Sequence, residues 1–141
     1  MDSPVSGFSH LQLLVSDIAR SAEWYATTLG LTRMAGSPEV GYLAMAGAGG
    51  RFAVVLSPRP AGDPSGPPTG IDHLAFTVRT VDELGDWAQQ LTAAGIAHGG
   101  LVSSGEGTSI HLRDPDGLPI ELITSQQIGV REGVRSATSA Q

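Results

Sequence analysis

Cysteine is absent from this sequence of 141 residues. The absence excludes disulfide bonds, thiolate zinc sites and a cysteine nucleophile. Any metal ion bound by this chain must therefore be held by histidine and carboxylate side chains. Four histidines and 14 acidic residues are available for that purpose.

Basic residues are also few. Eight Lys and Arg residues stand against 14 Asp and Glu residues, which gives a formal net charge of −6, and the eight are scattered along the chain. No basic face that would bind phosphates is expected, so nucleic acid is not a predicted partner.

Long apolar runs are missing as well. The longest are strand-sized, well short of the roughly 20 residues that a membrane helix needs. The first residues lack the basic start and the apolar run of a secretory signal. With 40% hydrophobic residues the chain has enough apolar material for a core. We therefore expect a cytoplasmic protein without a membrane partner.

What the chain does contain is an internal repeat. Segments 8–15 and 71–78 have the same strand pattern, and each carries a His-Leu pair that begins at His10 or His73. Each is followed by a polar helix start and an apolar helical pattern that ends at a glycine. Three strand-like segments then follow in each half: 32–35, 41–46 and 51–57 in the first, and 97–102, 108–113 and 118–124 in the second.

The repeat predicts an α+β fold made of two tandem βαβββ modules. The modules span 7–57 and 71–125, and together they are expected to form one domain over 1–125. The segment 58–70 is rich in Pro, Gly and Ser and is predicted to be a linker. The segment 126–141 has little apolar content and is predicted to be a flexible tail.

Alternation along the strands assigns each side chain to a face. The apolar row of the first strand suits packing against a helix and leaves His10 and Gln12 on the other face. The same argument places His73 and Glu121 away from the core in the second half. Polar residues on that face of three strands predict a shared pocket. Val55 occupies the position in the first half that Glu121 occupies in the second.

These features together resemble the vicinal oxygen chelate superfamily. The resemblance rests on the βαβββ repeat, the two His-Leu pairs, the Trp24-Tyr25 and Leu29-Gly30-Leu31 patterns, and the Asp-Pro-Asp-Gly turn that leads into Ile120-Glu121-Leu122. The superfamily includes glyoxalases, extradiol dioxygenases, fosfomycin-modifying enzymes, methylmalonyl-CoA epimerases and bleomycin-binding proteins. The resemblance implies curved mixed sheets that form half-cups, with a metal site where two half-cups meet.

The resemblance implies a divalent metal held by His10, His73 and Glu121. Two imidazoles and one carboxylate suit Fe(II) or Mn(II), with Zn(II) or Ni(II) as further options, and they leave neighbouring positions open. Glyoxalases and the epimerases usually supply a fourth ligand, which Val55 cannot provide. The three-ligand pattern is more similar to extradiol dioxygenases and fosfomycin-modifying enzymes, although the latter carry a catalytic Thr where Gln12 stands.

The function implied is a metal-dependent enzyme that acts on a small molecule with vicinal oxygens, with an Fe(II) dioxygenase as the leading hypothesis. His111 takes the place of a tyrosine in similar enzymes and is the candidate catalytic residue, since an imidazole can move a proton near neutral pH. The same site also suits a glyoxalase-type lyase or isomerase, and a non-catalytic drug-binding protein of the bleomycin-resistance kind is the alternative from another class.

The predicted substrate pocket includes Gln12, Tyr42, Val55 and Thr77. Its mixture of polar and apolar walls suits a fairly small ligand. Family members close the cup either within one chain or across a dimer, and the sequence leaves both open. A homodimer is expected, because half-cups with exposed edges usually find a partner. The substrate and the identity of the metal are not fixed by the sequence.

Overall fold

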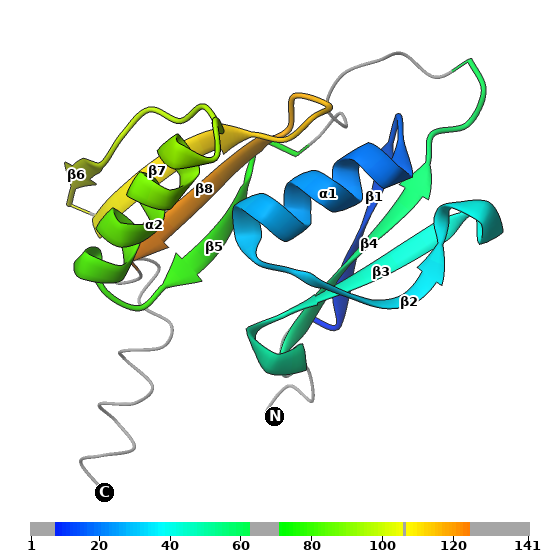
Figure 1. The fold of residues 1–141 in the computed structure, drawn as a ribbon, viewed down its shortest axis with the longest axis horizontal. Helices are drawn as coiled ribbons and strands as arrows, with labels where there is room; N and C mark the ends of the chain where they lie inside the picture. Colours follow the sequence, from blue (N-terminus) through cyan, green and yellow to red (C-terminus); the bar gives the residue numbers. More distant parts are fainter. Residues whose placement is uncertain (1–7, 63–70, 106, 125–141) are drawn as a thin grey trace, which may run out of the picture. The chain divides into compact units, whose positions relative to one another are not determined.

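The computed structural model describes residues 8–62, 71–105 and 107–124. The chain divides into two compact units, coloured along the sequence in Figure 1. Unit 1 comprises residues 1–70 together with the turn 114–117, and unit 2 comprises 71–113 and 118–141. The predicted tail lies outside the described residues, as does 63–70 of the predicted linker.

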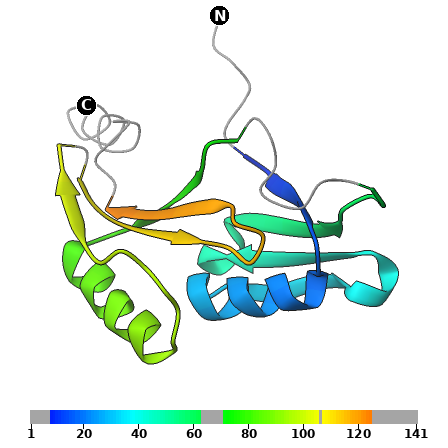
Figure 2. The same cartoon turned by 90° about the horizontal axis from the view of Figure 1, so that it is seen from above.

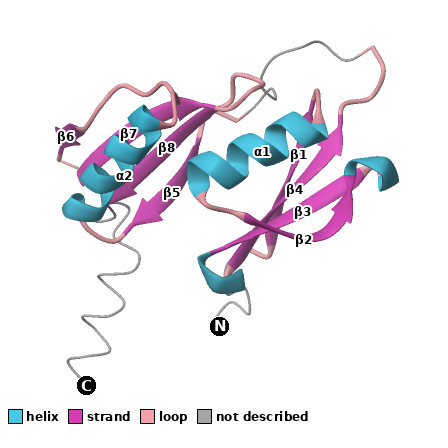
Figure 3. Ribbon diagram, in the orientation of Figure 1, coloured by secondary structure: helices cyan, strands magenta, loops and turns pink. Residues whose placement is uncertain are grey.

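Unit 1 contains one helix and a four-stranded sheet (Figure 3). The strand order is β1-β4-β3-β2, in which β1 runs parallel to β4 and the other pairs are antiparallel. The elements are β1 (His10–Val15), α1 (Ile18–Leu29), β2 (Thr32–Ser37), the 3-10 turn η1 (Pro38–Val40), β3 (Tyr42–Gly47), the 3-10 turn η2 (Ala48–Gly50) and β4 (Phe52–Pro58).

Local signals explain where α1 begins and ends. The side chain of Asp17 accepts a hydrogen bond of 3.0 Å from the backbone N–H of Arg20, which caps the first turn. Gly30 follows the helix with φ of 70°, a left-handed conformation that glycine adopts without strain. The helix and its terminating glycine are thus confirmed as the sequence predicts.

Unit 2 repeats the arrangement with the order β5-β8-β7-β6, and β5 runs parallel to β8. Thr80 caps its helix by accepting from the backbone N–H of Glu83. The elements are β5 (Leu74–Val78), α2 (Val81–Ala93), β6 (Val102–Ser104), β7 (Gly107–Arg113) and β8 (Pro119–Thr124).

The strand expected over 97–102 is wrong, since β6 occupies only Val102–Ser104. Gly100 has φ of 78°, and its N–H donates a hydrogen bond of 3.1 Å to Nδ1 of His98. This local bond closes a turn where an extended strand was expected. The cap of α2 also differs slightly, because Ala94 is the cap residue and Gly95, with φ of 76°, comes one position later.

In each unit the helix lies against one face of its own sheet, as Figures 1 and 2 show. Buried side chains of the helix and of that sheet face pack together in each unit, among them Tyr25, Leu43, Met45, Val54 and Leu56 in unit 1 and Leu84, Leu91, Ile110, Ile120 and Leu122 in unit 2. The predicted α+β class with two βαβββ modules and mixed sheets is therefore confirmed. None of the helices in the described ranges is long and apolar enough to cross a bilayer.

Candidate functional site

In each unit, the face of the sheet that is turned away from the helix is called the open face. The open face of unit 2 carries Glu121 at its centre, on β8. Glu121 lies opposite Ala75 of β5 and opposite His111 of β7, while its neighbours Ile120 and Leu122 are buried on the helix side. The Glu121 side chain retains 17% of its exposure, so its carboxylate is within reach of a bound molecule. His73 precedes Ala75 by two residues and lies directly before β5, so its position on the same face stays a prediction from alternation.

His111 is the side chain that contacts this carboxylate. Its Nδ1 lies 3.6 Å from Oε2 of Glu121, and its Nε2 lies 3.2 Å from Oγ of Ser109 on the same strand. The His111 side chain is 57% exposed and lies on the same face as Glu121. It can therefore exchange a hydrogen bond or a proton with a molecule that approaches the open face.

Unit 1 has the same register with a different set of side chains. Gln12 lies opposite Val55, as Ala75 lies opposite Glu121 in unit 2. The register thus makes His10 the counterpart of His73 and Val55 the counterpart of Glu121. Gln12 donates a hydrogen bond of 2.7 Å from Nε2 to Oγ of Ser57 on β4.

Further predicted pocket residues lie on the open faces of their own units. Tyr42 on β3 is 42% exposed and Leu14 on β1 is 43% exposed, with β4 between their strands. Thr77 in unit 2 is exposed on the same face as Ala75. These positions agree with the alternation predicted from the sequence, and their contact with a substrate stays a prediction.

Both candidate ligand histidines are hydrogen-bonded through Nδ1 by the residue that precedes them. Oγ of Ser9 lies 2.9 Å from Nδ1 of His10, and Oδ2 of Asp72 lies 2.6 Å from Nδ1 of His73. In both rings Nε2 is left for another partner, which is the arrangement usual for metal-bound histidine. The donor set therefore fits a divalent metal. Ser9 and Asp72 are not among the site residues predicted from the sequence, although a polar residue before each repeated histidine is a usable signal.

The predicted triad is distributed over the two units. Glu121 lies on β8 and His73 directly precedes β5 in unit 2, whereas His10 begins β1 in unit 1. Within residues 8–62, 71–105 and 107–124, no group of three or more His, Asp or Glu side chains is placed so that it could hold a metal ion. The joint coordination of one metal by His10, His73 and Glu121 remains a prediction.

The Asp-Pro-Asp-Gly turn has a structural role that the sequence does not indicate. It groups with unit 1, where the hydroxyl of Tyr25 donates a hydrogen bond of 2.8 Å to Oδ2 of Asp114. Oδ1 of Asp114 accepts from the backbone N–H of Asp116, whose own carboxylate accepts from the N–H of Ser16. Burial, and then the nearby Asp114 carboxylate, raise the pKa of Tyr25 far above its ordinary value. Asp114 therefore anchors α1 rather than serving the open face.

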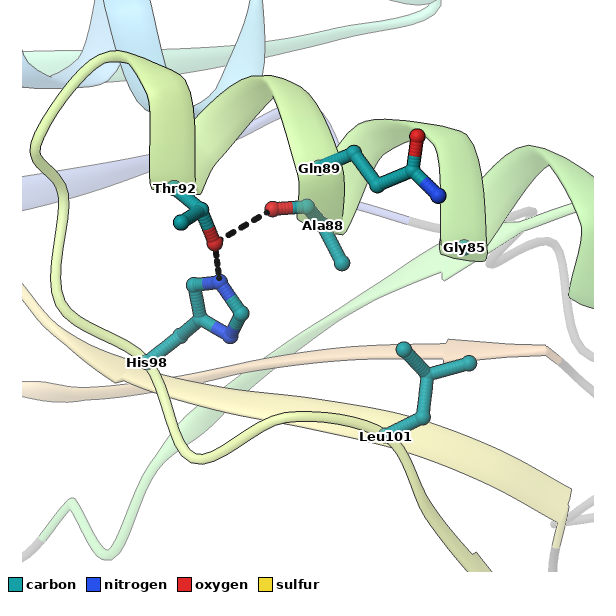
Figure 4. A pocket seen from close by; sticks show the side chains of 6 residues that line it. All are labelled: Gly85, Ala88, Gln89, Thr92, His98 and Leu101. Carbon is teal, nitrogen blue, oxygen red and sulfur yellow. Dashed lines mark hydrogen bonds between the residues drawn. The ribbon is translucent and has the colours of Figure 1, made fainter.

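A groove in unit 2 is separate from the open face. It is lined by Gly85, Ala88, Gln89 and Thr92 of α2 and by His98 and Leu101 (Figure 4). Because Gly100 donates to Nδ1 of His98, Nε2 carries the hydrogen and donates to Oγ1 of Thr92 at 2.9 Å. Thr92 in turn donates to the carbonyl of Ala88 at 3.0 Å, as Figure 4 shows. Nε2 of His98 thus holds the loop to α2, while Nδ1 is engaged by Gly100 within the loop.

Comparisons with known proteins agree with the two-module fold. The sequence model of the Glyoxalase/Bleomycin resistance protein/Dioxygenase superfamily matches residues 7–122. Biphenyl-2,3-diol 1,2-dioxygenase 3 of Rhodococcus globerulus is 32% identical over 116 residues, which cover 81% of this chain and 60% of the relative. The chain therefore spans about 60% of the length of that relative.

Solved structures have the same fold. A glyoxylase/bleomycin resistance protein/dioxygenase domain from Frankia sp. EAN1pec matches with a TM-score of 0.76 and 25% identity over 86% of this chain and 99% of that one. A variant of the fosfomycin resistance protein FosX from Listeria monocytogenes, complexed with Mn(II) and 1S,2S-dihydroxypropylphosphonic acid, matches with a TM-score of 0.69 and 22% identity. The match covers 86% of this chain and 94% of that one.

Proposed function

The chain belongs to the Glyoxalase/Bleomycin resistance protein/Dioxygenase superfamily, and we propose that it is a divalent-metal-dependent enzyme acting on a small molecule with two vicinal oxygens. The observation that carries the proposal is the open face of unit 2. There a half-buried carboxylate, Glu121, lies in register beside the strand that begins after His73 and in contact with His111. In unit 1, His10 lies at the position that corresponds to His73.

The proposed ligands are His10, His73 and Glu121. Two neutral imidazoles and one carboxylate leave adjacent coordination positions open, and this set favours Fe(II) or Mn(II), with Zn(II) or Ni(II) as alternatives. When bound, the metal supplies Lewis-acid polarisation of two adjacent substrate oxygens and, if it is iron, the redox chemistry that O2 requires. Both the presence and the identity of the metal are part of the proposal.

The proposed reaction class is Fe(II)-type dioxygenation. The similar Rhodococcus protein bears the name of a dioxygenase that acts on a diol, which supports a vicinal diol as the substrate class. His111 is the proposed catalytic residue, because its exposed ring faces the open side of the sheet while Ser109 and Glu121 fix its orientation. It would accept a proton or a hydrogen bond from a substrate hydroxyl.

The remaining side chains of the open faces would bind and orient the substrate. Gln12, held by Ser57, offers an amide to a polar group, whereas Val55 and Tyr42 offer apolar surface and Thr77 a hydroxyl. A homodimer is proposed together with this site, since open sheet faces and edges commonly find a second copy.

Metal content tests the proposal directly. The protein is purified anaerobically after growth with added iron and manganese, beside Glu121→Ala and the control Glu23→Ala, which removes an exposed carboxylate from α1. We expect about one equivalent of metal per chain in the wild type and the control, and a loss of metal in Glu121→Ala. Metal in the wild type no higher than in Glu121→Ala would refute the enzyme proposal and favour a metal-free drug-binding protein.

Oxygen uptake then separates the two enzyme classes. Consumption of O2 when a catechol or another vicinal diol is added to the iron-loaded protein supports a dioxygenase. Conversion of a substrate without O2 uptake by the Mn(II), Ni(II) or Zn(II) protein supports the glyoxalase-type lyase or isomerase instead, in which the metal polarises the same two oxygens.

A further inference from the structure

The residues that precede the two candidate ligand histidines differ in chemistry. Asp72 presents a carboxylate oxygen 2.6 Å from Nδ1 of His73, and Ser9 presents a hydroxyl 2.9 Å from Nδ1 of His10. An ionised carboxylate only accepts hydrogen bonds, whereas a hydroxyl can donate or accept. The two similar contacts therefore have different consequences for the imidazoles.

The contact with Asp72 determines the tautomer of His73. Because the carboxylate accepts, Nδ1 of His73 must carry the hydrogen, and the lone pair of the neutral ring lies on Nε2. The contact with Ser9 allows both tautomers of His10, since the hydroxyl hydrogen can turn toward Nδ1 or away from it. Only in the tautomer with hydrogen on Nδ1 is Nε2 ready to bind a metal.

We propose that Asp72 is a positioning residue that fixes the tautomer of His73 with hydrogen on Nδ1 and so prepares Nε2 of this ring to bind a divalent metal. The inference rests on the proposed function. Its geometric basis is the contact of 2.6 Å between Oδ2 of Asp72 and Nδ1 of His73, whereas the contact of His10 with Ser9, the one hydrogen bond of that ring among the described residues, leaves either tautomer open.

Removal of the Asp72 carboxylate is expected to weaken metal binding only moderately, because Asp72 is exposed. Its side chain retains 95% of its exposure and that of His73 retains 43%, so solvent screens the charge of the carboxylate at longer range. What remains is the direct hydrogen bond, which orients the His73 ring and makes Nε2 a better electron-pair donor to a metal. Loss of such a partner commonly weakens metal binding by about 10- to 100-fold, and the exposure favours the lower end of that range.

Binding of Mn(II) alone, measured from the signal of the free ion by electron paramagnetic resonance, tests the first part. We expect Asp72→Ala to weaken binding about 10-fold and Ser9→Ala to weaken it less than about 3-fold. Asp86→Ala removes the same charge from an exposed position of α2 in the same unit and is expected to bind as the wild type does. If Asp72→Ala and Asp86→Ala weaken Mn(II) binding equally, the effect is explained by the change in net charge alone, and the proposal is overturned.

Nitrogen NMR of the histidine rings in the metal-free protein tests the second part, at a pH where free imidazole is neutral. We expect the hydrogen of His73 on Nδ1 in the wild type and a shift toward Nε2 in Asp72→Ala, with His10 mixed in both proteins. A His73 ring with its hydrogen on Nε2 in the wild type overturns the proposal even if Mn(II) binds. Failure of the wild type to bind Mn(II), with the His73 tautomer as expected, instead refutes the proposed function and with it the role of Asp72 in loading.

Discussion

Tyr25→Phe isolates the buried hydrogen bond between α1 and the Asp114 turn. The substitution removes only the hydroxyl of a side chain that is fully buried, and it leaves the ring in contact with Trp24, whose centroid lies 4.9 Å away. Oδ2 of Asp114, in a residue that is 5% exposed, then loses its bond to Tyr25 while Oδ1 keeps its bond to the N–H of Asp116. A hydrogen bond to a charged group contributes about 1.5–3 kcal/mol, so we expect a loss of about 2 kcal/mol.

The loss is measured by urea and thermal unfolding followed by circular dichroism. For a chain of this length, about 2 kcal/mol corresponds to a decrease of roughly 6–10 °C in Tm. Tyr42→Phe is the matched control, because Tyr42 is 42% exposed, and a change within about 0.5 kcal/mol is expected for it. Equal stabilities for Tyr25→Phe and Tyr42→Phe would refute the role assigned to the Asp114 turn.

The buried hydroxyl of Tyr25 also predicts a dependence of stability on pH. Tyr25 has a folded-state pKa above the ordinary value of 10.0, because burial and Asp114 disfavour the phenolate. The protonated hydroxyl therefore contributes its full stability below pH 10, and that contribution is lost as the pH rises above 10, by about 1.4 kcal/mol per pH unit. Tyr25→Phe lacks this loss, so its stability should approach that of the wild type between about pH 10 and 11. A constant difference across this range would contradict the assignment.

Two further substitutions test the open faces. His111→Asn should lower kcat by about 100-fold with a smaller change in KM and with metal content unchanged, if His111 moves a proton and is not a ligand; loss of metal would contradict that role. Gly36→Ala should lower the free energy of unfolding by about 1–3 kcal/mol more than Gly41→Ala does. Both positions have positive φ, but only a Cβ at Gly36 would clash with the backbone carbonyl oxygen of Tyr42 and with its ring, at 2.7 Å. Equal destabilisation in urea would show that both the backbone and the ring of Tyr42 can move away.

The sequence predicts those features of the fold that depend on hydrophobic periodicity and on local helix caps. Alternation in β1 and β8 places His10 and Glu121 away from the core, and the structure agrees because Leu13, Val15, Ile120 and Leu122 are buried. The contact of His111 with Glu121 also follows from the length of the turn between β7 and β8, which sets the register. These features were predictable because each depends on neighbours in sequence.

Features that depend on a single side-chain contact were not predictable. The segment before β6 has a strand-like pattern, but the hydrogen bond from Gly100 to the His98 ring closes a turn there. The Asp114 turn was recognisable as a turn, yet nothing in its sequence indicates that a tyrosine 89 residues earlier donates to its carboxylate. The Nδ1 contacts of His10 and His73 likewise depend on rotamers that the pattern does not fix.

The repeated register allows the residues at equivalent positions of the two open faces to be compared. Gln12, Val55 and Ala44 of unit 1 occupy the positions that Ala75, Glu121 and His111 occupy in unit 2. Of these six residues, both ionisable ones belong to unit 2, whereas unit 1 supplies an amide and apolar surface beside its own histidine. A symmetric site would bind a metal equally from both modules. Within the proposed site, the carboxylate and the candidate proton carrier both belong to unit 2, and unit 1 would contribute an amide and apolar surface that select the polarity and shape of the ligand.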